Sequence, residues 1–562
     1  MENILEINNL SIVFKSQNES NKVINKVSYR LKRNEILGIV GESGSGKSVS
    51  SLAVLGLLPK KQTSFPTGEI LFNGENLLHY SNKKFQSLRG DKIAMIFQEP
   101  MTSLNPSMKC GEQVLEILQN HLKISRDEAF KEVIALFNKV QLPIPEELFN
   151  KYPHQISGGQ KQRVMIAMAI ACKPDVLIAD EPTTALDVTV QKEIILLLKS
   201  LQIETGMSII FISHDLSLVS EISDNIVVMF KGNVVESGTV EEVFNNPQNE
   251  YTKALINSRP SVTERLTILP TIQDYLKNTI NTETVSSDDR KRKHELLYAS
   301  EPLLRVVNVE KEYLSKGGFF TKPTIFKAVN DVSFDLYEGE TLGLVGESGC
   351  GKSTLGNAIL QLDKATAGNI FYKGVDITKL NKVSLRKLRK DIQLIFQDPY
   401  SSLNPRIPVG KAIMEPMKVH KLYANDKERK EKTLELLKRV GLDEDHFYRY
   451  PHEFSGGQRQ RIGIARTIAV NPKLIICDES VSALDISVQA QVLNLLNELK
   501  DNFGFSYIFI SHDLAVVKYM SDQLVVMNRG EIEEIGDADV IYSNPKTNYT
   551  KTLINAIPKG FD

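Results

Sequence analysis

The residues best suited to chemistry lie in one stretch, residues 152–187, which the chain repeats at residues 450–485. In each copy a Ser-Gly-Gly-Gln turn opens a helix, and an apolar strand then ends in two carboxylates, Asp180-Glu181 or Asp478-Glu479. A helix start offers unpaired N–H groups and the positive end of a dipole, which suits a phosphate oxygen. Of two carboxylates at a strand end, one could hold a metal ion and the other could position water for attack on a phosphate. The stretch therefore predicts phosphate chemistry, performed twice.

A glycine-rich loop upstream supplies a second element of such a site. Its backbone N–H groups would cradle phosphates, Lys47 would reach the β and γ phosphates, and Ser48 would bind Mg²⁺. An ordinary glycine-rich turn is the weaker interpretation, because it leaves two lysines at matched places unexplained. The two loops are Gly41-Glu42-Ser43-Gly44-Ser45-Gly46-Lys47-Ser48 and Gly346-Glu347-Ser348-Gly349-Cys350-Gly351-Lys352-Ser353, the second followed by Thr354.

Two histidines, His214 and His512, follow apolar strands at matched places. Each could contact a γ-phosphate or be a core histidine, and alone each is better explained as core. Because the histidine recurs together with the other motifs, the site interpretation is favoured. Gln98 and Gln397 would be unremarkable loop residues on their own.

The elements that must position these residues are also written twice. Residues 36–40 and 176–179 are apolar on both faces, as strands of a buried parallel sheet are. Residues 3–14 and 23–31 alternate like strands at an antiparallel edge. Residues 107–143 have helical spacing, with a capping box at Ser125 and Glu128. The sequence therefore predicts α/β domains with a mainly parallel core, an antiparallel β subdomain and a helical subdomain.

Length and composition fit a soluble protein of two domains. The chain has 562 residues, 41% hydrophobic and 24% charged, with a net charge of −1 and four scattered cysteines. This charge gives no general attraction to nucleic acid, and no apolar run approaches the about 18 residues of a membrane span. The N-terminus shows no secretory signal. We expect domains at residues 1–260 and 301–562, joined by a linker at 261–300 whose charge run, residues 288–293, is solvated.

Apart from the linker, the whole chain resembles two fused ATP-binding domains of the ABC transporter family. Each copy has the phosphate loop, the glutamine, the Ser-Gly-Gly-Gln signature, the Asp-Glu strand end, the Ala-Leu-Asp loop and the histidine. The resemblance implies P-loop NTPase domains of ABC type that pair within one chain and sandwich two ATP molecules, with Mg²⁺. One site would combine Lys47, Ser48, Gln98, Asp180, Glu181 and His214 with Ser455, Gly456, Gly457 and Gln458. The other would combine Lys352, Ser353, Gln397, Asp478, Glu479 and His512 with Ser157, Gly158, Gly159 and Gln160.

The resemblance also implies individual roles. It gives catalysis to Glu181, Glu479, His214 and His512. It gives metal contacts to Ser48, Gln98, Asp180, Ser353, Gln397 and Asp478. It places an aromatic side chain against the adenine base, for which Phe14 and Tyr313 are the nearest matches. Because these two stand at unequal distances before the lysine, a packed core aromatic is a fair alternative for each.

Within the family, the chain resembles the ATPases of oligopeptide, dipeptide and nickel importers. Both copies end alike, with Asn-Pro followed by Tyr-Thr-Lys at Tyr251 and Tyr549. Two departures stand out. Asn249-Glu250 and Thr547-Asn548 replace the usual His-Pro before the tyrosine, and no cysteine cluster follows the first copy, so an iron–sulfur site is not expected.

The implied function is to energise import as a peripheral subunit on the cytoplasmic face of the cell inner membrane. Partners would be two membrane permease subunits, docked near residues 98–106 and 397–405, and indirectly a solute-binding protein. The alternative is a soluble tandem ATPase acting on ribosomes or nucleic acid, which usually has a longer, charged connector. A direct nucleic-acid partner is therefore not expected. The solute stays open among dipeptides, oligopeptides, glutathione and nickel.

Overall fold

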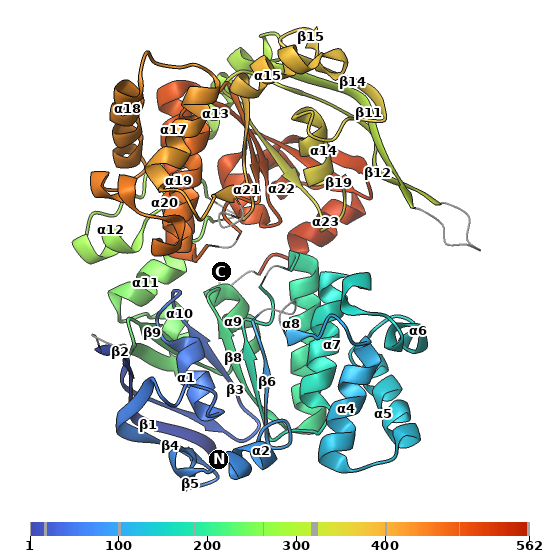
Figure 1. The fold of residues 1–562 in the computed structure, drawn as a ribbon, viewed down its shortest axis with the longest axis vertical. Coiled ribbons are helices and arrows are strands. Elements are labelled where there is room, and N and C mark those ends of the chain that lie inside the picture. Colours follow the sequence, from blue (N-terminus) through green and yellow to red (C-terminus); the bar gives the residue numbers. More distant parts are fainter. Residues whose placement is uncertain are drawn as a thin grey trace. The chain divides into compact units, whose positions relative to one another are not determined.

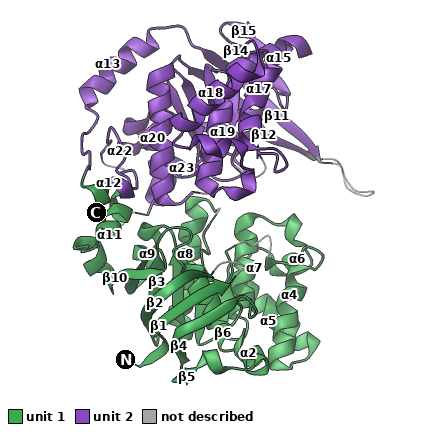
Figure 2. Cartoon of the chain, turned by 60° about the vertical axis from the view of Figure 1, so that its left-hand side comes forward, with its two compact units in different colours: residues 1–257, 275–278, 558–562 green, residues 258–274, 279–557 purple. Residues whose placement is uncertain are grey.

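The chain forms two compact units in a computed structural model (Figure 2). Unit 1 comprises residues 1–257, 275–278 and 558–562, and unit 2 comprises residues 258–274 and 279–557. Each unit has its own apolar core. This is expected, because a chain of this length is too long for a single hydrophobic core. The structure describes residues 2–15, 20–98, 103–184, 186–261, 264–315, 324–398, 402–482 and 484–558.

Within the described residues, each unit is built on a six-stranded sheet (Figure 1). The strands of unit 1 are β3 (Ile36–Val40), β6 (Ile93–Ile96), β7 (Val176–Asp180), β8 (Ser208–Ser213), β9 (Asn225–Phe230) and β10 (Asn233–Thr239). Those of unit 2 are β13 (Thr341–Val345), β16 (Ile392–Ile395), β17 (Leu474–Asp478), β18 (Ser506–Ile510), β19 (Gln523–Asn528) and β20 (Glu531–Asp537). The orders are β10-β9-β3-β8-β7-β6 and β16-β17-β18-β13-β19-β20. Neighbours pair in parallel except in the hairpins β9–β10 and β19–β20.

A second, antiparallel sheet accompanies each parallel one. In unit 1 it contains β1 (Asn3–Lys15), β2 (Ser20–Lys32), β4 (Thr63–Phe72) and β5 (Glu75–Asn76), in the order β2-β1-β4-β5. In unit 2 it contains β11 (Leu304–Ser315), β12 (Thr324–Leu336), β14 (Ala367–Tyr372) and β15 (Val375–Asp376), in the order β12-β11-β14-β15. Asn73 and Gly74, at φ of 47° and 80°, form the tight turn between β4 and β5, as the Asn-Gly pair predicts.

Helices complete each unit. Those of unit 1 are α1 (Lys47–Val54), α2 (Asn82–Leu88), α4 (Cys110–Leu122), α5 (Arg126–Lys139), α6 (Pro145–Phe149), α7 (Gly158–Ile170), α8 (Val188–Thr205), α9 (Leu216–Ile222), α10 (Val240–Asn245) and α11 (Glu250–Asn257). Those of unit 2 include α14 (Lys352–Ile359), α15 (Lys382–Asp391), α17 (Val409–Val419), α18 (Asp426–Arg439), α19 (Gly456–Ile468), α20 (Ile486–Phe503), α21 (Leu514–Met520), α22 (Ala538–Ser543) and α23 (Asn548–Asn555). The predicted capping box is present, since Ser125 and Glu128 exchange hydrogen bonds of 3.3 and 3.0 Å.

The core of each unit lies around the helix that follows the glycine loop. In unit 1, α1 contacts β2 of one sheet and β7 of the other. Ile12, Val54 and Ile178, from the two sheets and the helix between them, belong to one buried cluster. Helices α4, α5 and α6 pack together beside α7, which contacts β6. The predicted fold, a mainly parallel core with an antiparallel subdomain and a helical subdomain in each domain, is confirmed.

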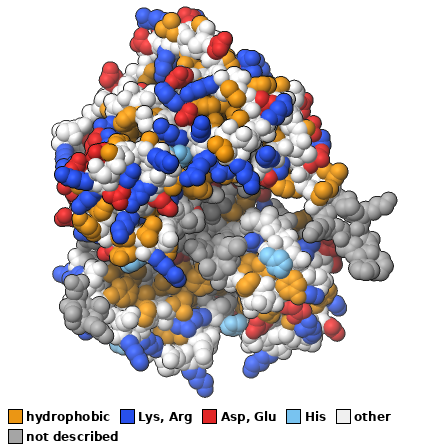
Figure 3. All heavy atoms as spheres, turned by 45° about the horizontal axis from the view of Figure 1, so that its top comes forward, with side chains coloured by type: hydrophobic (Ala, Val, Ile, Leu, Met, Phe, Trp, Pro, Cys, Tyr) orange, Lys and Arg blue, Asp and Glu red, His pale blue; other side chains and the backbone are white. Residues whose placement is uncertain are grey.

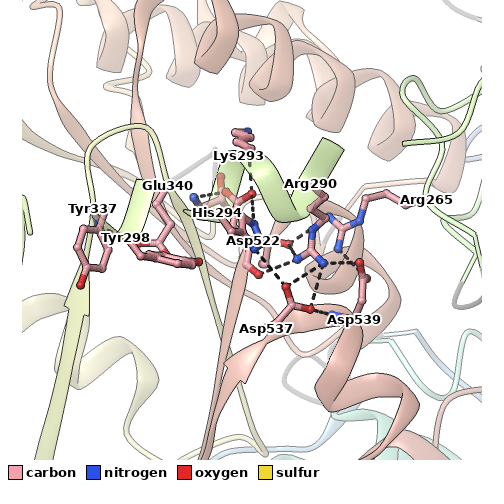
Figure 4. Close-up of polar contacts among 12 residues, drawn as sticks. Arg265, Arg290, Lys293, His294, Tyr298, Tyr337, Glu340, Asp522, Asp537 and Asp539 are labelled. Carbon is pink, nitrogen blue, oxygen red and sulfur yellow. Dashed lines mark hydrogen bonds and ion pairs between the residues drawn. The ribbon is translucent and has the colours of Figure 1, made fainter. Parts of the chain in front are cut away.

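The segment expected to be a linker is folded against unit 2. It contains α12 (Ile272–Lys277) and α13 (Ser287–Tyr298). Figure 4 shows Arg290 reaching Asp537 and Asp539, and His294 reaching Asp522. The side chains of Arg290 and His294 are only 10% exposed, so the expectation that the charge run is solvated is wrong at Arg290. The physical reason is the acidic edge of unit 2, which offers carboxylates that make burial of these cations affordable.

Charges of both signs are mixed with apolar side chains on the face drawn in Figure 3. All four cysteines are buried thiols outside any disulfide. Among the described residues, no helix is both long enough and apolar enough to cross a membrane.

Candidate active sites

The glycine loop of each unit closes around its own lysine. Lys47 is 4% exposed, and its Nζ donates to the carbonyls of Gly41 and Glu42 at 2.6 and 2.9 Å. A side chain at Gly41 would place its Cβ 2.1 Å from the carbonyl oxygen of Met229, so this position requires glycine. In the second loop, Lys352 bonds the carbonyls of Gly346 and Glu347 at the same 2.6 and 2.9 Å. Both loops therefore hold a buried ammonium group at the start of a helix, where a phosphate would bind.

The strand order brings the remaining residues to the same edge. Strands β3, β8, β7 and β6 are consecutive neighbours. The glycine loop, His214, Asp180-Glu181 and Gln98 each stand at or just after the carboxyl end of one of them. Because parallel strands all end at one edge, four separate motifs meet there.

A hydroxyl and a carboxylate meet at the expected metal position. Ser48 Oγ donates to Asp180 Oδ1 at 3.0 Å, and Ser353 Oγ to Asp478 Oδ1 at 2.9 Å. Burial, together with repulsion from Glu181, raises the pKa of Asp180 to about 6, although the Ser48 hydrogen bond lowers it. Burial also raises the pKa of Asp478. Hydroxyl and carboxylate oxygens are the ligands that Mg²⁺ prefers, so the residues present fit this ion.

Glu181 is the centre of a hydrogen-bonded group. Its Oε2 accepts from Gln98 Nε2 at 2.9 Å and from Thr184 Oγ1 at 2.9 Å, and lies 3.3 Å from His214 Nδ1. Burial opposes ionisation of this carboxyl. The hydrogen bonds from His214 and Thr184, with the nearby charges of His214 and Lys47, outweigh burial and lower its pKa to about 2. The carboxylate is therefore ionised and held in place.

The second unit repeats this group with two differences, at the histidine and at the hydroxyl residue. Glu479 Oε2 accepts from Gln397 Nε2 at 2.6 Å, and Oε1 lies 3.7 Å from His512 Nδ1. Despite burial, the bonds and charges of His512 and the charge of Lys352 lower the pKa of Glu479. Ser482, at the place of Thr184, donates to the backbone oxygen of Glu479 at 2.9 Å rather than to its carboxylate.

Both glutamates have a left-handed backbone conformation that residues other than glycine rarely adopt. Their φ angles are 48° at Glu181 and 47° at Glu479, and such residues carry strain of order 1–3 kcal/mol. The neighbouring strand holds them there. The Glu181 N–H donates to the Ile212 carbonyl oxygen, and the Glu479 N–H donates to that of Ile510, both at 2.9 Å. The bend turns each carboxylate out of the strand and toward the glutamine and histidine.

The signature turn caps its helix with its own side chains. Ser157 Oγ accepts the Gln160 N–H at 3.3 Å, and Gln160 Oε1 accepts the Ser157 N–H at 3.1 Å. The serine and glutamine of the second copy, Ser455 and Gln458, do the same at 3.3 and 3.0 Å. A Cβ at Gly159 would approach Val190 to 2.9 Å, so the glycine permits close packing of α7 on α8. The predicted helix start is confirmed, and its part in a second site stays a prediction.

The two candidate adenine-stacking residues occupy equivalent strand positions. Phe14 pairs with Asn21 across the β1–β2 hairpin, and Tyr313 pairs with Phe326 across the β11–β12 hairpin. The longer second hairpin thus explains their unequal distance from the lysine. Phe14 packs partly buried against the core, whereas Tyr313 is 43% exposed and its hydroxyl donates to Asp363 at 2.6 Å. Their contact with adenine stays a prediction.

Sequence reasoning gave no structural role to two tyrosines of the repeated ending. The hydroxyls of Tyr251 and Tyr549 accept the N–H groups of Glu42 and Glu347 at 3.0 and 3.1 Å. The only sequence signal was that the ending occurs twice. Of the predicted stretches, residues 99–102 and 399–401 and the alanine of each Ala-Leu-Asp loop lie outside the described residues.

Comparison with known proteins relates the chain to transport ATP-binding proteins. The ABC transporter family model matches residues 24–184 and 329–482. The model of the oligopeptide/dipeptide transporter C-terminal region matches residues 235–284 and 534–560. Among solved structures, a dimeric bacterial ABC transporter cassette is 31% identical over 42% of this chain and 98% of its own, with a TM-score of 0.38.

Curated relatives extend over the whole chain. The glutathione import ATP-binding protein GsiA of Escherichia coli O157:H7 is 46% identical over 99% of this chain and 90% of its own length. GsiA of Salmonella choleraesuis is 45% identical over 99% of this chain and 89% of its own length. The family model matches more than half of the residues, in two copies that carry the loop, the strand-end carboxylates and the signature. On these grounds, the chain belongs to the ABC transporter family.

Proposed function

We propose that this chain is the ATP-hydrolysing subunit that energises import of short peptides, with glutathione as the first candidate solute. The observation that carries the proposal is the oligopeptide/dipeptide transporter region after each ATP-binding copy. The relatives named for glutathione import support it, because they match 99% of this chain. The alternative of a soluble ATPase acting on ribosomes or nucleic acid finds no support.

The geometry explains how the chain's residues would carry out hydrolysis. Lys47 would exchange the loop carbonyls for phosphate oxygens, and Ser48 with Asp180 would hold Mg²⁺, which shields phosphate charge when bound. Glu181, ionised and fixed by Gln98 and Thr184, would orient the attacking water. His214, beside the same carboxylate, would donate toward the γ-phosphate. Lys352, Ser353, Asp478, Glu479, Gln397 and His512 would act likewise.

Pairing of the halves within one chain is a further part of the proposal: each phosphate loop would work with the signature of the other copy. Ser455→Arg should then abolish turnover when only Glu181 is active, in a Glu479→Gln background. The same change should matter little in a Glu181→Gln background, and Ser157→Arg is the mirror control. The opposite pattern would show that each signature serves its own copy.

A groove lined by apolar and charged side chains supports the proposed contact with permeases. In unit 2 a groove of about 360 Å³ lies between β16, α17 and α19, beside Gln397. Leu362, Phe396 and Val419 line it and are 55%, 44% and 44% exposed. In unit 1, Phe97, directly before Gln98, is 42% exposed, and Leu57, which follows α1, is 41% exposed. Such apolar side chains suit a short helix of a membrane partner, which would keep the chain peripheral at the cytoplasmic face.

Uptake measurements test the proposal directly. Cells from which the gene is deleted should lose uptake of labelled glutathione, and the wild-type gene should restore it. The matched Glu181→Gln, Glu479→Gln double variant should not. If the deletion abolished dipeptide uptake but left glutathione uptake intact, the assignment as an importer subunit would stand and glutathione would be rejected as its solute.

A pull-down tests the partners. The tagged double variant, held in ATP, should recover two multi-spanning proteins from detergent-solubilised membranes. Recovery of ribosomes or nucleic acid without a membrane protein would reject the importer.

A further inference from the structure

The tyrosine of the repeated ending touches the phosphate loop in unit 1. Tyr251 lies on α11, is 2% exposed, and its hydroxyl accepts the backbone N–H of Glu42 at 3.0 Å. Its ring lies against Phe230 with centroids 4.2 Å apart. Glu42 is the second residue of the glycine loop, so a residue more than two hundred positions away bonds the loop backbone.

The same bond recurs in unit 2 in different surroundings. Tyr549 on α23 accepts the backbone N–H of Glu347 at 3.1 Å. Asn528 stands at the end of β19 where Phe230 ends β9, and its side chain donates to Glu533. Tyr549 is only partly buried. The two copies therefore share the hydrogen bond, whereas the burial of the tyrosine differs.

Each tyrosine is carried by a short segment anchored on the sheet. In unit 1, the Glu236 carboxylate on β10 accepts the N–H groups of Gln248 and Asn249 at 2.7 and 3.1 Å. In unit 2, Glu534 on β20 accepts those of Lys546 and Thr547 at 3.1 and 3.4 Å. A matched glutamate thus fixes where each helix begins.

The departures from the usual His-Pro fit this role. Asn249 accepts the Tyr251 N–H at 2.9 Å, and Thr547 accepts the Thr550 N–H at 3.1 Å. Asparagine and threonine are favoured helix-capping residues. The substitutions therefore keep a firm start to the helix that carries the tyrosine.

Lys47 and Tyr251 hold Glu42 by different groups. Lys47 Nζ bonds the carbonyl oxygen of Glu42 at 2.9 Å, while Tyr251 bonds its N–H. A lysine that turns to a phosphate gives up loop carbonyls. The tyrosine bond does not involve the lysine and can persist through that change.

We propose that Tyr251 and Tyr549 are positioning residues that hold the phosphate loops in the shape that binds ATP. Through them, the region after each ATP-binding copy sets nucleotide affinity. The proposal rests on the two loops being the phosphate sites.

The test is a Tyr251→Phe, Tyr549→Phe double variant, which removes two hydroxyls and keeps the rings. One lost hydrogen bond per site should raise the KM for ATP about 2- to 10-fold, with kcat little changed. Tyr549→Phe alone, at the less buried ring, should give a smaller rise without loss of folding. An unchanged KM in the double variant would overturn the proposal.

A control separates loop positioning from general stability. Tyr507 is fully buried, and its hydroxyl donates to the Leu496 carbonyl at 3.0 Å. Tyr507→Phe should lower the melting temperature and leave the KM for ATP unchanged. An equal KM rise in this control would assign the effect to structure alone and reject positioning.

The loop assignment has its own control. Lys47→Ala with Lys352→Ala should abolish ATP binding. If ATP binding survived, the loops would not be the phosphate sites and the tyrosine proposal would fall with them. If it were abolished while the tyrosine variants behaved as wild type, only the tyrosine proposal would fail.

Discussion

The two units agree at one edge of their parallel sheets and differ at the other. At the carboxyl ends of the strands, Lys47 and Lys352 make the same bonds at the same distances. At the amino ends, Asp224 and Asp522 both accept the first N–H of the central strand, from Ile36 at 2.8 Å and Thr341 at 2.9 Å. The edges differ in the other side chains that contact this aspartate and the helix beside it.

Unit 2 builds a charged cluster on this aspartate. Lys500 Nζ donates to Asp522 and to the Thr341 hydroxyl, both at 2.8 Å. Figure 4 shows His294 beside Asp522, at a distance of 3.3 Å. In unit 1, Gln202 on α8 instead donates to the Asn34 carbonyl at 2.8 Å. The carboxyl-end edge has the same lysine bonds in both units, because both carry the same set of motifs. At the amino-end edge, unit 2 instead packs against the segment between the two copies.

The largest effect should come from the shared edge. Glu181→Gln and Glu479→Gln keep the size of the side chain and remove its charge. We expect the double variant to lower ATP turnover about 10²- to 10⁴-fold, and each single variant to lower it by at least half, in a phosphate-release assay. If one single variant kept wild-type turnover, that site would be inert and the two units would not be catalytically equivalent.

A smaller effect should mark the edge that differs. Arg290→Ala removes one buried cation from Asp537 and Asp539, which keep His294 and Arg265 as partners. We expect unit 2 to lose about 2–3 kcal/mol in denaturant unfolding, less than a fully buried pair because these carboxylates are partly exposed. The matched control is Arg292→Ala, whose side chain is 73% exposed beside Asp289. Equal shifts for both variants would show that the cluster does not stabilise unit 2.

The same cluster should make unit 2 less stable as pH rises from 5 to 8. Hydrogen bonds that His294 donates to the carboxylates of Asp522 and Asp537 raise the pKa of His294 above its ordinary 6.5. Burial raises the pKa of Glu340, beside Tyr298, from 4.5 to about 7. A raised folded-state pKa gives stability that is complete below the unfolded pKa and is lost as pH rises through the folded one.

Thermal unfolding across this pH range measures the loss. The lowered pKa values of Asp522 and Asp537 act only at more acidic pH. His294→Gln should flatten the decline above pH 6.5, because the imidazole no longer contributes to it. A decline of the same size in this variant would rule out the histidine as its source.

The smallest effect should come from the one residue that differs between the phosphate loops at a buried position. Cys350 is 5% exposed and stands where unit 1 has Ser45, which is 2% exposed. Because the serine serves the same fold in unit 1, Cys350→Ser should change the KM for ATP by less than about twofold. A larger change would show that the two loops are not interchangeable.

Local patterns let the sequence predict the helices and strands, and they single out the candidate site residues. The Asn73-Gly74 turn, the Ser125 cap and the Ser157 helix start depend on residues within a few positions of one another. Their geometry follows from backbone preferences and capping bonds, which act over the same short range. The fold class followed because apolar and alternating runs distinguish buried from edge strands.

Contacts between distant residues could not be predicted in this way. Gln98 gains its partner Glu181 only because β6 and β7 are neighbours, and Tyr251 reaches Glu42 only because α11 follows the sheet's last hairpin. Arg290 was expected in solvent, since nothing in its own stretch reveals the carboxylates of Asp537 and Asp539. The sequence by itself determined which residues could do chemistry and which elements carry them. Strand order and burial in the tertiary structure decided which of them meet, because both depend on how the whole chain packs.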